Sequence, residues 1–287
     1  MNRDASANLR GAGLMVASMA GFAVEDAFLK ASARHLPLGQ VMIVMGLCGM
    51  AVFAAMSLRR GERPLPRGVL APMMLARSAA EIAGRLFYTL AVALTPLSSA
   101  SAILQATPLV VIAGAALLFR ERVGAARWLA VALGFLGVLM ILRPGAEGFS
   151  ALSFLAVAGT LGFAGRDLAT RAAPVALSNR QLGALGFAML AVAGALILAW
   201  TGGAHWPDAR VAGLVLGATT FGIAGYYALT AAMRTGEISA VTPFRYMRLV
   251  CALILAAVVF GERPDGWTLA GAALIVGAGI FGLSRRS

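Results

Sequence analysis

The stretch GFAVEDAFLK, residues 21–30, places charged side chains inside a run that is otherwise apolar enough to cross a membrane. The pattern returns as GFAGRDLATR at residues 162–171, an offset of 141 positions from residue 21 to residue 162. Asp26 and Asp167 occupy the same place in the two copies, and both copies end on a basic residue. The recurrence predicts that one structural unit is written twice in the chain.

The same offset relates other parts of the sequence. IAG at 82–84 returns at 223–225, and FRER at 119–122 is matched by FGER at 260–263. Three polar residues keep the register, with Gln40 matched by Gln181, Thr89 by Thr230 and Ser98 by Ser239. Chance matches of small apolar residues do not explain one gap-free register that extends from residue 21 to residue 262.

The composition indicates an all-α integral membrane protein. Of 287 residues, 60% are hydrophobic and 13% are charged, and the mean hydropathy is +0.84, whereas soluble domains are roughly a quarter charged. The net charge of +12 comes almost entirely from arginines that lie between apolar runs. This placement favours contact with anionic lipid headgroups and argues against nucleic acid as a partner.

Apolar windows of about 18–24 residues, the length that spans the hydrocarbon core, predict ten transmembrane helices. The windows are residues 11–33, 37–58, 69–94, 98–118, 125–142, 149–172, 180–200, 211–233, 238–260 and 266–284. They divide into a first unit at 11–143 and a second at 149–284, with five helices in each. Because five is an odd number, the second unit would enter the membrane from the opposite face, as in inverted-repeat transporters.

Basic residues outside these windows predict the orientation. One side of the membrane would collect Arg3, Arg10, Arg59, Arg60, Arg63, Arg67, Arg120, Arg122, Arg234, Arg285 and Arg286, and the other only Arg34, Arg143, Arg210 and Arg263. Since positive charge gathers on the cytoplasmic side, both termini are expected in the cytoplasm.

Each five-helix unit closes with a pattern such as Pro108, FRER at 119–122, Arg127-Trp128, Gly137 and RPG at 143–145. These units resemble the EamA repeats of the drug/metabolite transporter superfamily, and the resemblance covers nearly the whole chain. It implies a basket of helices around a central cavity, as in bacterial ten-helix exporters of amino acids and related metabolites. The second copy has WTL at 267–269 where the first has ARW at 126–128, so these positions are not expected to be functional in both halves.

Intramembrane charges mark candidate site residues, because an ionised group at a helix centre costs roughly 2.5–3.5 kcal/mol. Arg77, Glu81 and Arg85 are spaced four apart and share one helical face, which is expected to line the interior. They could contact an anion or carboxylate in the substrate pathway, or form a structural lattice with acidic residues of the first and sixth helices.

The first and sixth helices carry Glu25 with Asp26, and Arg166 with Asp167. By the inversion, the first pair lies toward the outside and the second toward the cytoplasm. One hypothesis is two gates closed by ion pairs, in which a buried carboxylate could also carry a proton. The alternative is that the carboxylates cap neighbouring helices.

Pro108 and Pro243 predict breaks in the fourth and ninth helices. Polar residues near these breaks are Gln105, Thr107, Thr242, Arg245, Tyr246 and Arg248, and Tyr226 belongs to the aromatic residues expected near the cavity. Arg248 is the main candidate to bind a substrate carboxylate or phosphate, with pairing to Glu81 as the alternative. Arg245 is expected to reach toward the lipid headgroups.

These features favour a secondary transporter of the bacterial inner membrane that exports small amphipathic metabolites, amino acids foremost, by alternating access. Another solute, such as a vitamin, nucleoside derivative or drug, is the alternative, followed by a membrane-embedded enzyme or lipid-handling protein. The sequence has no P-loop, HExxH or GxSxG motif, and GxGxxG at 277–282 lies inside an apolar helix. We therefore expect no catalytic residues, metal or cofactor, and a monomer or homodimer whose partners are its small-molecule substrate and membrane lipids.

Overall fold

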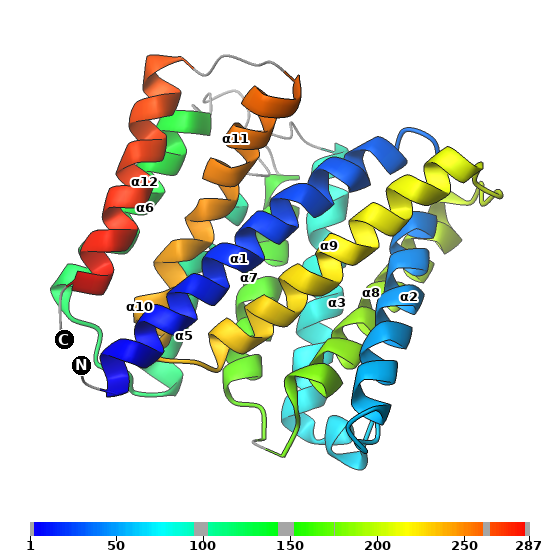
Figure 1. Ribbon diagram of the computed structural model, residues 1–287, viewed down its shortest axis with the longest axis horizontal. Helices are drawn as coiled ribbons and strands as arrows, with labels where there is room; N and C mark the ends of the chain where they lie inside the picture. Colours follow the sequence, from blue (N-terminus) through cyan, green and yellow to red (C-terminus); the bar gives the residue numbers. More distant parts are fainter. Residues whose placement is uncertain (1–2, 95–102, 143–151, 175, 261–264, 285–287) are drawn as a thin grey trace.

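The computed structural model describes residues 3–94, 103–142, 152–174, 176–260 and 265–284, which are mostly helical and contain no strand (Figure 1). The helices of the first part are α1 (Arg3–Ser32), α2 (Leu38–Leu58), the 3-10 turn η1 (Arg67–Leu70), α3 (Pro72–Leu94), α5 (Thr107–Leu118) and α6 (Ala125–Leu142). Those of the second part are α7 (Ser153–Arg171), α8 (Asn179–Thr201), α9 (Ala209–Met233), α10 (Ile238–Val241), η3 (Thr242–Tyr246), α11 (Met247–Phe260) and α12 (Gly266–Ser284).

Five segments in the described ranges are long and apolar enough to cross a membrane. They are Ser6–Leu29, Leu38–Leu58, Asn179–Thr201, Ala209–Met233 and Ile238–Leu255, and shorter apolar helices lie within α5, α6 and α12. The helices α3 and α7, with 23 and 19 residues, each carry three charged side chains that lower their hydropathy. This is the all-helical architecture of a multi-pass membrane protein.

Several predicted helix boundaries agree with the structure, and others are wrong. α6 and α12 match the predicted windows 125–142 and 266–284. α1 begins at Arg3, before the predicted residue 11, because a polar helical turn precedes the apolar run. α3 begins at Pro72, after η1. Ser98, residues 143–145 and Glu262, to which the sequence also drew attention, lie outside the described residues.

The two predicted proline breaks are confirmed. Pro108 lies in the first turn of α5, where the missing N–H has no helical acceptor to lose. Pro243 lies in η3, which separates α10 from α11. The broken helix α10–η3–α11 keeps Thr242, Pro243 and Tyr246 buried at the break.

Helices from the two halves of the chain pack against each other. The main contacts join α1 to α9, α3 to α7, α2 to α8 and α6 to α12, and Figure 1 shows α1 running alongside α9. The sequence offset converts α1 into α7 and α3 into α9, so it exchanges the first two of these pairs. The other two pairs each join a helix to its own counterpart.

Glycines allow close approaches of the α1–α9 and α3–α7 pairs at equivalent positions. A Cβ atom at Gly21 would lie 3.2 Å from the Cα of Gly225, and a Cβ at Gly162 would lie 2.5 Å from the backbone nitrogen of Gly84. The offset relates Gly21 to Gly162 and Gly84 to Gly225. Two helix pairs therefore touch backbone to backbone through the same residue type, as is common in membrane helix packing.

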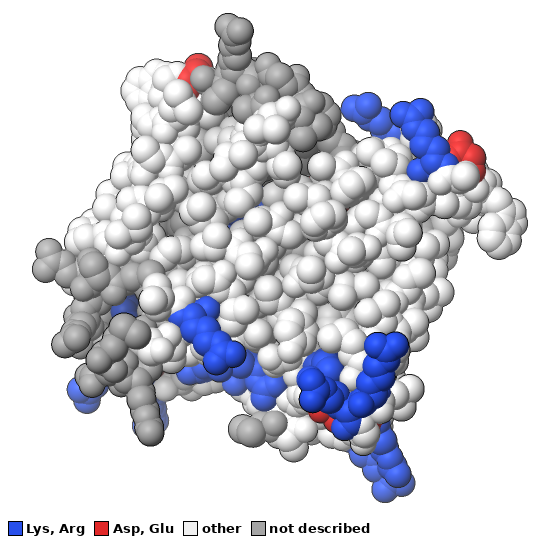
Figure 2. Space-filling model, viewed as in Figure 1, with Lys and Arg blue, Asp and Glu red and all other residues white. Residues whose placement is uncertain are grey.

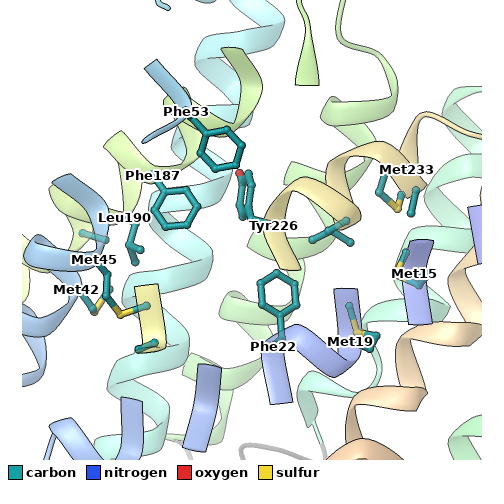
Figure 3. Close-up of a cluster of buried hydrophobic side chains, with 14 of the residues drawn as sticks. Met15, Met19, Phe22, Met42, Met45, Phe53, Phe187, Leu190, Tyr226 and Met233 are labelled. Carbon is teal, nitrogen blue, oxygen red and sulfur yellow. The ribbon is translucent and has the colours of Figure 1, made fainter. Parts of the chain in front are cut away.

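The largest apolar cluster draws residues mainly from α1, α2, α8 and α9 and includes Tyr226 (Figure 3). The rings of Phe53 and Phe187 are 5.6 Å apart between centroids, and those of Phe187 and Tyr226 are 5.5 Å apart. Tyr226 is 2% exposed, and this packing fixes its hydroxyl within a buried charged cluster.

Candidate functional site

Glu81 of α3 is the centre of this charged cluster and is fully buried. Its Oε1 accepts a hydrogen bond from Nη1 of Arg166 at 3.1 Å, and its Oε2 accepts one from the Tyr226 hydroxyl at 2.6 Å. Arg77 and Arg85 approach the same carboxylate to 4.0 and 3.7 Å. Three arginines therefore share one acid, and the predicted common face of α3 is confirmed.

Arg77 is also fully buried, yet one of its nitrogens is unpaired. Its Nε donates to Oγ1 of Thr170 at 3.0 Å, and its Nη2 donates to the Tyr226 hydroxyl at 2.8 Å. Among the described residues, its Nη1 has no hydrogen-bond acceptor. The residues around the adjacent gap are Arg77, Arg166, Asp167, Thr170, Tyr226, Leu229, Thr230 and Met233, and they leave no room for a solute. An acceptor for Nη1 would require these helices to move apart.

Asp167 of α7 joins the cluster to the broken helix. Its Oδ1 accepts from Nε of Arg166 at 2.9 Å, and its Oδ2 accepts from Nη1 of Arg245 in η3. The side chains of Asp167 and Arg245 are 2% and 12% exposed. The expectation that Arg245 reaches toward lipid headgroups is wrong, because its charge is taken by this buried carboxylate.

Asp26 of α1 pairs with the same broken helix from the other side. Arg248 Nε donates to Oδ2 of Asp26 at 2.8 Å, and Arg248 Nη2 donates to Oδ1 at 2.6 Å. Here the side chains are 47% and 32% exposed for the acid and the base. The suggested pairing of Arg248 with Glu81 is therefore wrong, because a two-pronged contact with Asp26 occupies the guanidinium.

These two aspartates are the residues related by the sequence offset, and their arginines lie about one turn apart on the chain. The Asp167–Arg245 pair is nearly closed to solvent, and the Asp26–Arg248 pair is open. The two contacts thus hold one short segment, η3 and the start of α11, between α1 and α7.

Glu25 of α1 has a different environment. It is 5% exposed, and in the described part of the chain no hydrogen bond or ion pair reaches its carboxylate. It faces Gly222 of α9, where an added Cβ would lie 3.0 Å from its Oε1. The offset relates Glu25 to Arg166 and Gly222 to Glu81. Where one half has an arginine–glutamate ion pair, the other half therefore has a glutamate opposite a glycine.

Two predicted residues are not joined to the charged cluster. Oγ1 of Thr107 donates to the carbonyl of Leu104 at 2.5 Å, a local contact at the start of α5. Gln105 is half-buried, and no side-chain hydrogen bond from another described residue reaches it. Both remain candidates by position alone.

A second polar cluster was missed by the sequence reasoning. Arg127 of α6 donates to Glu237 and, at 2.7 Å, to Oγ of Ser239. Glu121 accepts from the backbone N–H of Ser239 at 3.0 Å, and Asn8 accepts from that of Glu237 at 2.8 Å. We call these five residues the α10 clasp. Arg127 and Glu121 belong to the closing pattern of the first unit, which was the available signal.

On the surface, charged residues lie near the ends of the helices, and the middle of that surface is uncharged. Figure 2 shows a broad white band across the helices, with Lys and Arg gathered mainly along the edge where α1 begins. Arg59, Arg60, Arg63 and Arg67 follow α2 at this end of the molecule. Such a band is the expected lipid-facing surface of a membrane protein.

Residues 9–143 and 149–285 each match the EamA-like transporter family. The chain belongs to this family. It is therefore a multi-pass protein of the bacterial inner membrane and a membrane transporter of small molecules. The resemblance noted from the sequence is confirmed.

Its relatives are named as transporters, not as enzymes. The pseudopaline exporter CntI of Pseudomonas aeruginosa is 30% identical over 283 residues, which cover 95% of this chain and 96% of the relative. A riboflavin transporter of Rhizobium johnstonii is 32% identical over 190 residues, 66% of this chain and 62% of that protein's length. An S-adenosylmethionine uptake transporter of Rickettsia conorii is 24% identical over 200 residues, 69% of this chain and 67% of the relative.

A solved crystal structure superimposes on the chain with a TM-score of 0.78 at 22% identity, and the match covers 96% of each chain. This similarity supports the fold over nearly the whole length.

Proposed function

We propose that this protein is a secondary transporter that exports small amphipathic metabolites, amino acids foremost, by alternating access. The observation that carries the proposal is the unequal pair of aspartate–arginine contacts on the broken helix. One is buried and the other is open. The two aspartates occupy equivalent positions, and a difference in exposure between their ion pairs is what a carrier closed on one side and open on the other would have.

The proposed architecture is ten transmembrane helices in two inverted five-helix repeats, with both termini in the cytoplasm. Two separate matches to the family, at 9–143 and 149–285, support the division. The exchange of the α1–α9 and α3–α7 contacts by the sequence offset supports a two-fold relation. The basic surface at the end where α1 begins supports a cytoplasmic location for that end.

The charge balance of the site favours a substrate with an anionic group. The basic residues are Arg77, Arg85, Arg166, Arg245 and Arg248, and the acidic residues are Glu25, Asp26, Glu81 and Asp167. Five positive charges thus face four negative ones, and Nη1 of Arg77 has no acceptor among the described residues. A carboxylate would satisfy both conditions.

A second candidate substrate class is a vitamin or nucleoside derivative. The relatives named for riboflavin and S-adenosylmethionine motivate it. Inverted symmetry makes the two directions of transport formally alike, so export is proposed from the resemblance to exporters, including the full-length similarity to CntI.

Transport by purified protein in proteoliposomes tests these proposals. Vesicles preloaded with the common amino acids, riboflavin or S-adenosylmethionine are diluted, and release is compared with protein-free vesicles. We expect release of at least one amino acid and its loss in the Glu81→Gln variant. Release of riboflavin or S-adenosylmethionine without any amino acid would select the second candidate. If no solute of the set moves, both substrate proposals are wrong.

A further inference from the structure

We propose that Glu25 and Arg85 are the two poles of a binding site for a zwitterionic solute. The cationic group of the solute would contact the Glu25 carboxylate, and its anionic group would contact the Arg85 guanidinium. This inference rests on the proposed transport function and names the chemical class of its substrate.

Among the described residues, no cation forms an ion pair with the carboxylate of Glu25. α9, which packs most extensively against α1, presents Gly222 and no charged side chain at this point. The charges near Glu25 are Arg85 from α3, Arg248 from α11 and the adjacent Asp26. Arg248 is occupied by its two-pronged contact with Asp26. A buried carboxylate without a partner is costly, so a cation supplied by a ligand would stabilise it.

Arg85 is the least engaged arginine of the α3 face. Its Nε lies 3.7 Å from Oε1 of Glu81 but makes no hydrogen bond with the described residues. Glu81 already accepts from Arg166 and Tyr226. The Arg85 side chain is 24% exposed, whereas Arg77 is fully buried. Arg85 can therefore offer donors to a solute without breaking an existing hydrogen bond.

The two poles are near each other but not in contact. The charges of Arg85 and Arg248 act on Glu25, and no ion pair within 4.0 Å joins Arg85 to it. Their counterparts under the sequence offset, Arg166 and Tyr226, are in contact, with the guanidinium carbon 5.9 Å from the ring centroid. In one half, Arg166 and Tyr226 contact each other at these positions. In the other half, the oppositely charged Glu25 and Arg85 form no ion pair.

Aromatic rings beside the poles suit the apolar part of an amphipathic solute. The Arg85 guanidinium lies 5.9 Å from the Phe163 ring centroid, and that of Arg248 lies 5.5 Å from the Phe22 centroid. An α-amino acid carries its ammonium and carboxylate on one carbon, so both groups can reach opposite poles while the side chain packs on these rings.

Ligand binding to purified protein tests the assignment of the two poles. The common amino acids are screened by calorimetry, and the tightest binder is compared with its deaminated acid and its decarboxylated amine. For leucine these are 4-methylpentanoate and 3-methylbutylamine. We expect Glu25→Gln to weaken leucine binding at least tenfold and leave 4-methylpentanoate unchanged. We expect Arg85→Gln to weaken leucine equally and leave 3-methylbutylamine unchanged.

Equal loss of all three ligands in Glu25→Gln would overturn the inference, because it would indicate a conformational or proton-linked role. Unchanged amino-acid binding in either variant would also overturn it, and the proposed transport would stand. If the wild-type protein bound no amino acid, the inference would fail together with the amino-acid part of the proposed function.

Thermal unfolding without ligand supplies a second readout. Glu25→Gln removes an unpaired buried charge, so its melting temperature should be no lower than that of the wild type. The matched variant Glu81→Gln, which removes a paired acid, should melt well below it. A Glu25→Gln protein that fails to fold would show that the carboxylate has a structural partner, and the proposed pole would be wrong.

Discussion

Replacing Glu81 by glutamine should destabilise the protein more than any other single change of an acid to its amide in the described chain. The carboxylate accepts hydrogen bonds at 3.1 and 2.6 Å and lies within 4.0 Å of two further arginines. A neutral amide would leave Arg77, Arg85 and Arg166 without their shared counter-charge. Breaking a buried pair from one side costs about 3–5 kcal/mol.

At about 2–4 °C per kcal/mol for domains of this general size, the melting temperature in detergent should fall by roughly 10 °C. A matched control is Glu62→Gln. Glu62 accepts hydrogen bonds from Arg180 and Ser178, but the side chains of Glu62 and Arg180 are 26% and 23% exposed. We expect a small shift for this pair because water screens it. Equal shifts for the two variants would refute the reasoning about the buried cluster.

Three further predictions concern the helix seam, an exposed acid and the open ion pair. Gly162→Ala should lower the melting temperature, because its Cβ would lie 2.5 Å from the facing α3 backbone, whereas Gly13→Ala, with no atom within 4 Å, should not. The hydrogen bond from Arg180 lowers the pKa of Glu62, so the pair stabilises the protein above the ordinary glutamate pKa of about 4.3. The difference in stability between wild type and Glu62→Gln should therefore be constant above about pH 5 and vanish on further acidification, as measured by melting curves against pH. Arg248→Lys should slow transport about fivefold, because an ammonium cannot make the two-pronged contact with its aspartate and loses about 1 kcal/mol; an unchanged rate in proteoliposomes would contradict this.

Much of the fold could be predicted because the length of an apolar run and the position of a proline determine helix boundaries through local interactions. α6 and α12 begin where their hydropathy begins, and Pro108 and Pro243 lie at helix breaks. The start of α1 was missed because the polar turn before residue 11 is stabilised by a distant partner, the N–H of Glu237 bonded to Asn8. Hydropathy carries no information on such a contact.

The sequence predicted which residues belong to the site better than it predicted which of them form ion pairs with each other. Spacing placed Arg77, Glu81 and Arg85 on one face, but it could not show that Arg166 would reach Glu81. The sequence offset identifies equivalent positions, and it does not state which positions touch. The partner of Arg248 was therefore missed, since Asp26 lies far away in sequence.

The clasp around α10 was missed for a related reason. Arg127 lies in a stretch whose second copy differs, which argued against a role in both halves. The structure shows a role in one half, because the backbone of a short helix needs acceptors and donors from neighbouring segments.

Arg245 lies in η3 and Arg248 lies in the first turn of α11, on one continuous helical segment. A shift of that segment that drew one guanidinium away from its aspartate would also displace the other. The buried and the exposed ion pair are therefore coupled through the backbone of the few residues that follow Pro243.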